Sequence, residues 1–343
     1  MQAAAGAQVD RVLRRELSLS APSVRRVAFG VALELEGVEA PTLGDGVRTP
    51  AAAEPCTHVR RVAAAEIASR WADARPERAR ELRGRDGRLL LSVDADPIHG
   101  YLMRTPLDGR FLVSRDGLEI LCAPLARAAR SWTELLVGQL LPLVATLRGL
   151  EVFHASAVEL DRGALLFTAP PGAGKTSVAL HLVLAGARLL TDDAVSIEAR
   201  CDRLMAHPGA GALGVHRDEQ RRLGRRERER LGGARRVAGK TLYGVSAAGG
   251  PVPVTALFVL QRLGSSSREP IVRPLDPVDP FMLLASTFNL SVRTPERLRR
   301  QLEVCARLAD EVPVMALDVA PEVDAGALAA CVLEWAEQRV AGV

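Results

Sequence analysis

Eight consecutive residues of this sequence have the types and spacing to bind phosphate groups. The segment at residues 169–176 reads Ala-Pro-Pro-Gly-Ala-Gly-Lys-Thr. Gly172 and Gly174 allow the backbone to approach a ligand closely and to adopt positive φ angles. Lys175 can reach the outer phosphates of a nucleotide, and the hydroxyl of Thr176 can bind Mg²⁺. We therefore predict a phosphate-binding loop (P-loop, Walker A) in its permissive form, with alanine in place of the first glycine.

The flanking segments are those that such a loop requires. Residues 164–168 form a short apolar run that is typical of a buried strand. Residues 177–185 have helical spacing, and Gly186 lies where a C-terminal cap belongs. A helix that begins here directs unpaired N–H groups and its dipole toward an anion. The alternative is a glycine-rich turn whose lysine has no ligand. The predicted nucleotide-binding residues are Pro171, Gly172, Ala173, Gly174, Lys175, Thr176 and Ser177.

Two adjacent carboxylates, Asp192 and Asp193, follow the next apolar run at Leu189 and Leu190. Neighbouring carboxylates can take separate roles, one at a metal ion and one accepting a proton from a hydroxyl nucleophile. The pair lies where a strand–helix–strand unit with parallel strands returns to the phosphate site. A turn at residues 191–193 that caps a following segment is the alternative.

Together with His154-Ala155-Ser156-Ala157-Val158 and residues 186–190, these segments resemble the catalytic domain of HPr kinase/phosphorylase. The resemblance is closer still to the HPr-kinase-related proteins of bacterial peptide-modification clusters. In that family a histidine before the first strand lies near the transferred phosphate, which is the place of His154. The resemblance also implies that Asp192 is the proton acceptor and Asp193 the principal metal ligand. It is specific over residues 154–197 and looser over residues 101–150 and 253–335.

Two features depart from that family. Ala169 replaces the first glycine of the loop, which is tolerated if this residue has an ordinary φ angle. The glycine-rich signature that follows the loop in HPr kinases has no clear copy here. The resemblance therefore does not extend to HPr as the substrate or to the reverse, phosphorylase reaction.

The implied function is an ATP- and Mg²⁺-dependent kinase that transfers the γ-phosphate to a hydroxyl, most readily a serine of a peptide or small protein. Two alternatives stay open: a kinase of a small molecule, and a nucleotide-gated binding module without phosphoryl transfer. Asp192 and His154 argue against the binding module, because nucleotide binding alone requires neither. An open groove beside the loop would favour a peptide, and a closed pocket would favour a metabolite.

Composition excludes several other classes of protein. The 343 residues are 48% hydrophobic and 25% charged, with a net charge of +4 and only 3% aromatic residues. So few aromatics argue against stacking on single-stranded nucleic acid, and the charge is too small to indicate DNA binding. Five scattered cysteines indicate reduced thiols in a cytoplasmic protein. We expect no membrane span, since the apolar run at residues 135–147 is short and contains Pro142. Homo-oligomer formation is left open.

The chain is long enough for two domains. The predicted fold class is α/β, with a P-loop kinase core of the HPr kinase type at residues 126–343 and a small, mainly β domain at residues 1–125. Alternation and Asp-Gly turns predict strands in the first domain, at residues 31–36, 89–93, 100–105, 110–114 and 118–122. A capping-box pattern from Ser131 to Glu134 predicts a helix that bends at Pro142 and braces the catalytic sheet, with Trp132 as a core anchor.

The segment after the Asp pair is rich in Arg and Glu over residues 217–236. It is interpreted as a solvated helix and mobile loop, or alternatively as a substrate-docking or phosphate-closing lid. Lys240 is the best candidate for a second cation at the phosphate, and a plain surface lysine is the alternative. Further strands are predicted at residues 194–198, 254–260, 271–275 and 314–319. Further helices are predicted at residues 280–288, 294–309 and 325–339, the second capped by Thr294.

Overall fold

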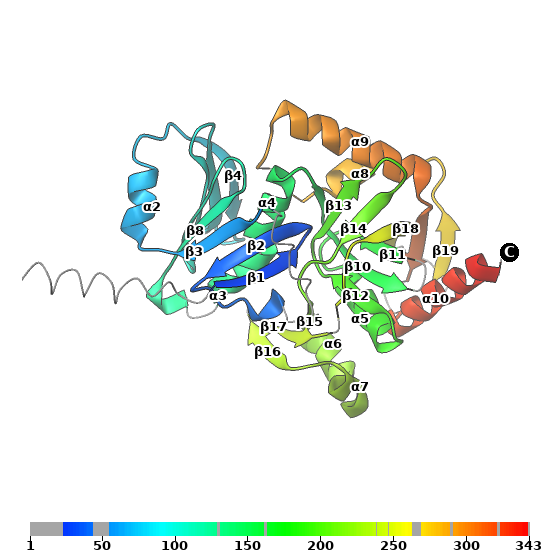
Figure 1. The fold of residues 1–343 in the computed structure, drawn as a ribbon. Helices are drawn as coiled ribbons and strands as arrows, with labels where there is room; N and C mark the ends of the chain where they lie inside the picture. Colours follow the sequence, from blue (N-terminus) through cyan, green and yellow to red (C-terminus); the bar gives the residue numbers. More distant parts are fainter. Residues whose placement is uncertain are drawn as a thin grey trace, which may run out of the picture.

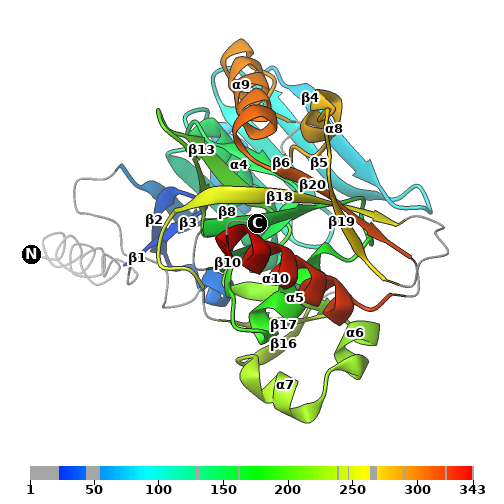
Figure 2. The same cartoon turned by 90° about the vertical axis from the view of Figure 1, so that its right-hand side faces the viewer.

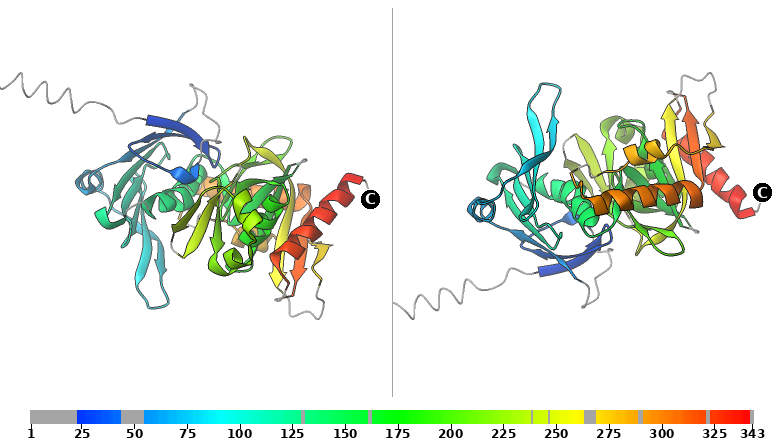
Figure 3. Two further views of the ribbon diagram at one scale, coloured as in Figure 1. Left: turned by 90° about the horizontal axis from the view of Figure 1, so that it is seen from below. Right: turned by 90° about the horizontal axis from the view of Figure 1, so that it is seen from above.

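Two large β-sheets organise the protein (Figure 1). The computed structural model describes residues 23–43, 55–128, 131–160, 163–237, 239–245, 247–262, 269–288, 291–320 and 323–341. An eight-stranded sheet lies within residues 23–124, and a nine-stranded sheet lies within residues 151–319. The first sheet and the C-terminal helix α10 lie at opposite ends of the molecule (Figure 3). No helix in the described part of the chain is long and apolar enough to cross a membrane.

The first sheet has the strand order β1-β2-β3-β8-β7-β6-β5-β4. Its strands are β1 (Ser23–Ala28), β2 (Val31–Glu36), β3 (Thr57–Arg61), β4 (Glu77–Arg83), β5 (Leu89–Asp96), β6 (Gly100–Thr105), β7 (Gly109–Val113) and β8 (Glu119–Pro124). The predicted strand at residues 31–36 and the antiparallel meander β6-β7-β8 are confirmed. Strands β1, β3 and β4 were not predicted, because the adjacent arginines of β1 and β3 and the many charged residues of β4 hide the alternation. The short helix α2 (Ala64–Arg70) packs on this sheet.

The helical segment after the first sheet consists of α3 (Ser131–Leu135), a π-helical turn at Leu136–Leu140 and α4 (Leu141–Leu147). Pro142 has no N–H for the usual bond four residues back, and the helix changes register just before it. Trp132 is a core anchor as predicted, since it is 5% exposed and its ring lies 6.5 Å from that of Phe111. The prediction that this helix braces the catalytic sheet is confirmed for α4, which lies against β9 and β13. The apolar side chains of the whole segment also belong to the core of the first sheet, so the segment packs between the two sheets.

The second sheet has the order β12-β10-β11-β18-β14-β13-β9, with β20 beside β18 and β19 beside β20. Its strands are β9 (Glu151–Phe153), β10 (Ala155–Leu160), β11 (Gly163–Thr168), β12 (Arg188–Thr191), β13 (Val195–Ala199), β14 (Leu204–His207), β18 (Val252–Arg262), β19 (Ile271–Pro274) and β20 (Val314–Val319). Strands β11, β18 and β20 are parallel, and β10 lies antiparallel between β11 and β12. The carboxyl ends of β11, β12, β18 and β20 therefore share one edge of the sheet.

Helices cover both faces of the second sheet (Figure 2). They are α5 (Lys175–Leu184) and α10 (Ala325–Ala341) on one face, and α8 (Pro280–Ala285) and α9 (Pro295–Glu311) on the other. The predicted N-cap of α9 is confirmed, because the hydroxyl of Thr294 accepts a hydrogen bond from the backbone N–H of Arg297 at 3.3 Å. Each face thus has its own apolar core around the sheet.

The turn between β1 and β2 inserts into the second sheet region. Phe29 at this turn has a φ of 54° and is 2% exposed, and its N–H donates to the carbonyl of Pro208 at 2.7 Å. A Cβ atom on Gly209 would lie 2.3 Å from the hydroxyl of Thr191 and 2.6 Å from the Phe29 ring. Only glycine therefore fits between the first sheet and the residue that precedes Asp192.

The arginine-rich segment forms α6 (Arg217–Arg222), α7 (Arg225–Arg230) and strand β16 (Ala234–Val237). Neither helix contains a buried residue, as expected for solvated helices. The strand was not predicted; it completes a three-stranded antiparallel sheet with β15 (Ala212–His216) and β17 (Lys240–Gly244). This small sheet places residue 240 at a defined position near the end of β12.

Candidate active site

The loop at residues 169–174, here called the 169–174 loop, connects β11 to α5. Gly172 and Gly174 have φ angles of 80° and 110°, in the region that favours glycine. Ala169 does not have a positive φ, which explains why alanine is tolerated there. Helix α5 begins at Lys175, so its first N–H groups point into the loop. The strand–loop–helix arrangement therefore offers an anion the N-terminal end of a ten-residue helix.

The side chain of Lys175 folds back over the loop. It is 6% exposed, and its ammonium donates to the carbonyl of Ala169 at 2.8 Å. Burial lowers the pKa of Lys175, while Asp193 and Asp192 act in the opposite direction. Among the described residues this ammonium has no carboxylate within ion-pair distance. It is thus a buried cation held by a neutral acceptor, which a phosphate oxygen can replace.

Asp192 receives four hydrogen bonds, three of them from distant parts of the chain and one from its neighbour Asp193. One carboxylate oxygen accepts from the hydroxyls of Ser156 at 2.7 Å and Thr176 at 2.9 Å, and from the N–H of Asp193 at 3.1 Å. The other oxygen accepts from the N–H of Gly214 at 3.1 Å. Burial and the neighbouring Asp193 raise the pKa of Asp192 to about 6, against the effect of these hydrogen bonds. The carboxylate is therefore fixed in orientation beside the first turn of α5.

Asp193 has a different environment. Its φ is 65°, rare for a residue with a side chain, and its side chain is 53% exposed. One carboxylate oxygen lies 3.7 Å from the ammonium of Lys240. The predicted second cation thus lies at the Asp pair. The chain contains only two lysines, Lys175 and Lys240, among its 45 Lys and Arg residues, and both interact with Asp193.

His154 completes the group. Its Nδ1 lies 2.9 Å from the carbonyl oxygen of Asp193. A carbonyl can only accept, so Nδ1 carries the proton and the neutral ring leaves Nε2 as an acceptor. Burial, and to a smaller extent Lys175, lower the pKa of His154, which favours the neutral ring. The N–H of His154 also donates to the carbonyl of Ser286 at 2.6 Å, which fixes the start of β10.

The structure brings together His154, Lys175, Thr176, Asp192 and Asp193. Pro171, Ala173 and Ser177 supply loop and helix backbone; the Ser177 side chain forms no hydrogen bond with the described residues. The other histidines lie elsewhere, for example His181 beside Glu219 and His207 beside Glu198.

Sequence reasoning missed three residues of this site. Ser156 and Gly214 donate to Asp192, and Arg262 at the end of β18 donates to the carbonyl of Ala173 at 3.0 Å. Ser156 lies in the run that carries the family resemblance, where the alternation of β10 placed it on the same side as Asp192. Gly214 and Arg262 gave no local signal, because their contacts depend on strand pairing across long stretches of chain.

The oxygen atoms at this site suit Mg²⁺. The candidates are the Thr176 hydroxyl and the carboxylates of Asp192 and Asp193. Across the residues that the structure describes, no group of three His, Cys, Asp or Glu side chains could hold a metal ion on its own. Mg²⁺ is commonly held by one or two carboxylates together with substrate phosphates and water. The donors therefore fit a Mg²⁺ ion that arrives with a nucleotide.

Comparisons with known proteins do not assign a function to this chain, so a functional assignment depends on the geometry of the site. No family model and no curated protein matches the chain. Among solved structures, the HPr(Ser) kinase/phosphatase from Coxiella burnetii is similar at 14% sequence identity, with a TM-score of 0.31. The alignment covers 56% of this chain and 97% of that chain. A similarity at this level carries no argument about the reaction.

Asp192 is expected to make the nucleotide-free protein less stable as the pH rises. Its pKa lies at about 6 in the folded chain, above its ordinary value of 3.8. Between these values the folded state binds the proton more tightly than the unfolded state, so this contribution to stability is present at low pH and is lost above about pH 6. Thermal unfolding in metal-free buffer should show a flatter pH dependence for Asp192→Asn over this window. An equal slope of unfolding temperature against pH in the wild type and in Asp192→Asn would contradict the raised pKa of Asp192.

Proposed function

We propose that this protein is an ATP- and Mg²⁺-dependent kinase that transfers the γ-phosphate to a hydroxyl group, a serine of a peptide or small protein. The observation that supports this proposal most strongly is the position of Asp192 and Asp193 beside the 169–174 loop. One carboxylate is bonded to the first turn of α5, and the other is exposed beside a lysine and a histidine. A module that only binds a nucleotide has no need of the second carboxylate.

The residues of the loop have distinct proposed roles. The backbone N–H groups of residues 172–176 hold the phosphate chain at the start of α5. Lys175 exchanges its bond to the Ala169 carbonyl for a phosphate oxygen and neutralises charge there. Arg262 holds the loop through the Ala173 carbonyl. Mg²⁺, bound with the nucleotide, would neutralise charge on the phosphates, and Thr176 with one of the aspartates would hold it.

The contacts favour an order of roles for the Asp pair opposite to that implied by the family resemblance. The Asp192 carboxylate accepts a hydrogen bond from the Thr176 hydroxyl, which supports a role for Asp192 as a metal ligand beside Thr176. Asp193 is exposed and has only Lys240 as an ion-pair partner among the described residues, so an incoming hydroxyl can reach it. We propose that Asp193 accepts the proton of the hydroxyl. In this proposal His154 holds the Asp193 backbone through its carbonyl, Lys240 holds the Asp193 carboxylate, and both lie at the transferring phosphate.

A peptide is favoured over a small molecule as the acceptor. More than half of the Asp193 side chain is exposed, so the proposed proton acceptor faces solvent rather than a closed cavity. A serine within a polypeptide can approach such an open position, whereas selective binding of a metabolite requires enclosure.

Transfer from γ-labelled ATP to a library of serine-containing peptides tests this proposal. We expect label on peptides only with Mg²⁺ present, and none on the matching peptides with alanine in place of serine. Label on small-molecule hydroxyls alone would support the metabolite kinase. Nucleotide binding without transfer to any acceptor would support the binding module.

A further inference from the structure

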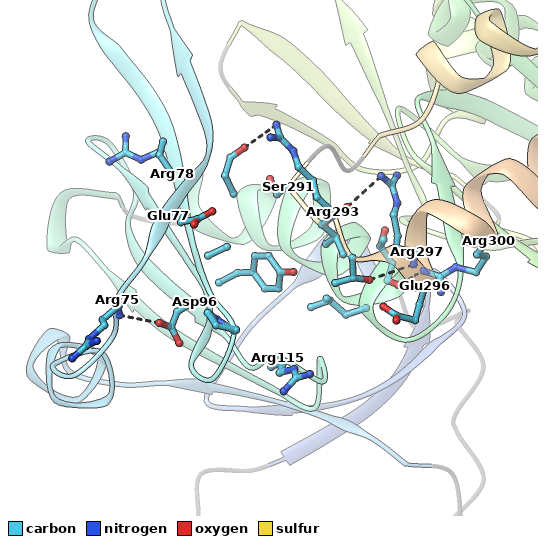
Figure 4. Close-up of a pocket in the computed structure, with 18 residues that line it drawn as sticks. Arg75, Glu77, Arg78, Asp96, Arg115, Ser291, Arg293, Glu296, Arg297 and Arg300 are labelled. Atoms are coloured by element: carbon cyan, nitrogen blue, oxygen red, sulfur yellow. Dashed lines mark hydrogen bonds between the residues drawn. The ribbon is translucent and has the colours of Figure 1, made fainter.

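A cavity lies away from the Asp pair, between the first sheet and the start of α9. Its volume is about 650 Å³, within the range of ligand sites. Its lining includes six arginines, Arg75, Arg78, Arg115, Arg293, Arg297 and Arg300, against three carboxylates, Glu77, Asp96 and Glu296. Figure 4 shows Arg75 and Arg78 on one wall and Arg293, Arg297 and Arg300 on the opposite wall, with Arg115 at the lower edge between them.

One of the three carboxylates in the lining, Asp96, is already held by the surrounding chain. Asp96 accepts hydrogen bonds from the backbone N–H groups of Arg75, Ile98 and His99, and from the His99 ring. These bonds, that of the His99 N–H foremost, lower the pKa of Asp96. Within the described chain, the guanidinium groups of Arg75 and Arg115 form no ion pair. The cavity thus retains two guanidinium groups that no carboxylate of the described residues contacts directly.

Two buried guanidinium nitrogens in the lining, Nε of Arg297 and Nε of Arg300, lack partners among the described residues. Arg300 uses another nitrogen to donate to the carbonyl of Thr146 at 2.7 Å. The hydroxyls of Tyr101 and Ser291 also line the cavity, and neither forms a hydrogen bond with any residue that the structure describes. Buried polar groups are normally hydrogen-bonded, so this lining is incomplete without a polar ligand.

The position of the cations identifies the class of ligand. Arginines on both walls match a ligand with several separated anionic groups rather than one compact anion. Strand β4, which carries Glu77, Arg78 and Ala79 of the lining, is an edge strand of the first sheet. An edge strand offers main-chain hydrogen bonds to an extended polypeptide, and a small anion cannot use them.

We propose that this cavity binds an acidic segment of a polypeptide. The inference rests on the proposed function and deepens it, because it identifies the peptide substrate as acidic. The cavity is also connected to the active site. Arg297 of its lining pairs with the buried Glu151 at 2.6 Å, and Glu151 begins β9, which leads directly to His154. Glu151 and His154 are three residues apart in an extended chain, which corresponds to a span of about 10 Å.

The arginines of α6 and α7 form another basic surface that could bind an acidic peptide. Several of them pair with acids of the same segment, such as Arg225 with Glu229 at 2.8 Å and Arg221 with Asp218 at 3.5 Å. Arg226 on α7 is exposed and supplies a control that removes the same charge as a change at Arg115.

The test uses the full chain without nucleotide and a fluorescein-labelled peptide, Gly-Glu-Ser-Glu-Gly-Glu. Its partner has glutamine at each glutamate position. Fluorescence anisotropy at low ionic strength should show binding of the glutamate peptide only. Arg115→Gln should weaken this binding about tenfold, as expected for a charge-assisted hydrogen bond. Tyr101→Phe, which removes only an unpartnered hydroxyl and should fold normally, should also weaken it. Arg226→Gln should stay within about twofold.

Three outcomes would overturn the proposal: equal binding of both peptides, equal losses in Arg115→Gln and Arg226→Gln, or binding of citrate through Arg115 without binding of the peptide. The last would show a site for small anions. Lys175→Ala should leave peptide binding unchanged. A protein that binds the glutamate peptide but no nucleotide would therefore refute the kinase and leave the acidic-peptide site standing.

Discussion

Replacement of Lys175 by alanine is expected to reduce phosphoryl transfer by about 10²- to 10³-fold, the loss typical for removal of one group that stabilises transition-state charge. Lys175 is the only lysine on the 169–174 loop and α5, and its ammonium already lies over the loop at the Ala169 carbonyl. The loss should appear both in binding of a fluorescent ATP analogue and in transfer to a serine peptide.

Two controls separate this effect from misfolding and from charge alone. Thermal unfolding of Lys175→Ala should change little, because the lost bond is to one neutral carbonyl. Lys175→Arg keeps the charge but replaces a compact ammonium with a planar fork, so it should remain impaired. Wild-type transfer by a folded Lys175→Ala protein would remove the loop from the reaction.

The second large effect concerns the Asp pair. Asp193→Asn is expected to bind ATP and Mg²⁺ nearly as the wild type does and to lose about 10²- to 10⁴-fold in transfer, the contribution typical of a general base. Asp192→Asn is expected to lose the part of nucleotide binding that depends on Mg²⁺, because Asp192 shares its oxygen with Thr176. Titrations with and without Mg²⁺, combined with single-turnover transfer, measure the two effects separately.

The opposite pair of profiles would restore the order implied by the family resemblance, with Asp192 as the base. Glu159→Gln is a suitable control for loss of a carboxylate, since Glu159 lies on β10 but pairs with Arg188 and with no residue of the site. Full transfer activity in Asp193→Asn would exclude that residue as the proton acceptor.

The parts of the site that can be predicted from the sequence are those that a local sequence pattern defines. The loop glycines, the start of α5 and the Asp pair lie within one stretch, where spacing alone sets their neighbours. Lys240 was a weaker prediction, because its position depends on β16, a strand of Ala, Arg and Val that shows no clear alternation. The structure places it at Asp193.

The cavity at α9 could not be predicted in this way. Its lining comes from β4, β5, β6, α4 and the residues around Thr294, which are distant in the chain. Each arginine there is unremarkable alone, in a sequence where arginine supplies nearly all of the positive charge. Residues of β4 and of the start of α9 line one cavity only because of the packing of the folded chain, which no local pattern encodes.

The contacts of Phe29 and Trp132 limit how the first sheet of such a chain can be exchanged for that of another protein during evolution. A chimera joined directly after Pro124 would leave Trp132 and Leu136 behind and open the core beneath the first sheet. A joint near Gly149 would carry the helix with its sheet, but Phe29 would still need a glycine in the recipient where Gly209 lies. The two halves are therefore inherited as a matched pair, and a foreign first sheet would disturb the backbone next to Asp192 before it altered any catalytic side chain.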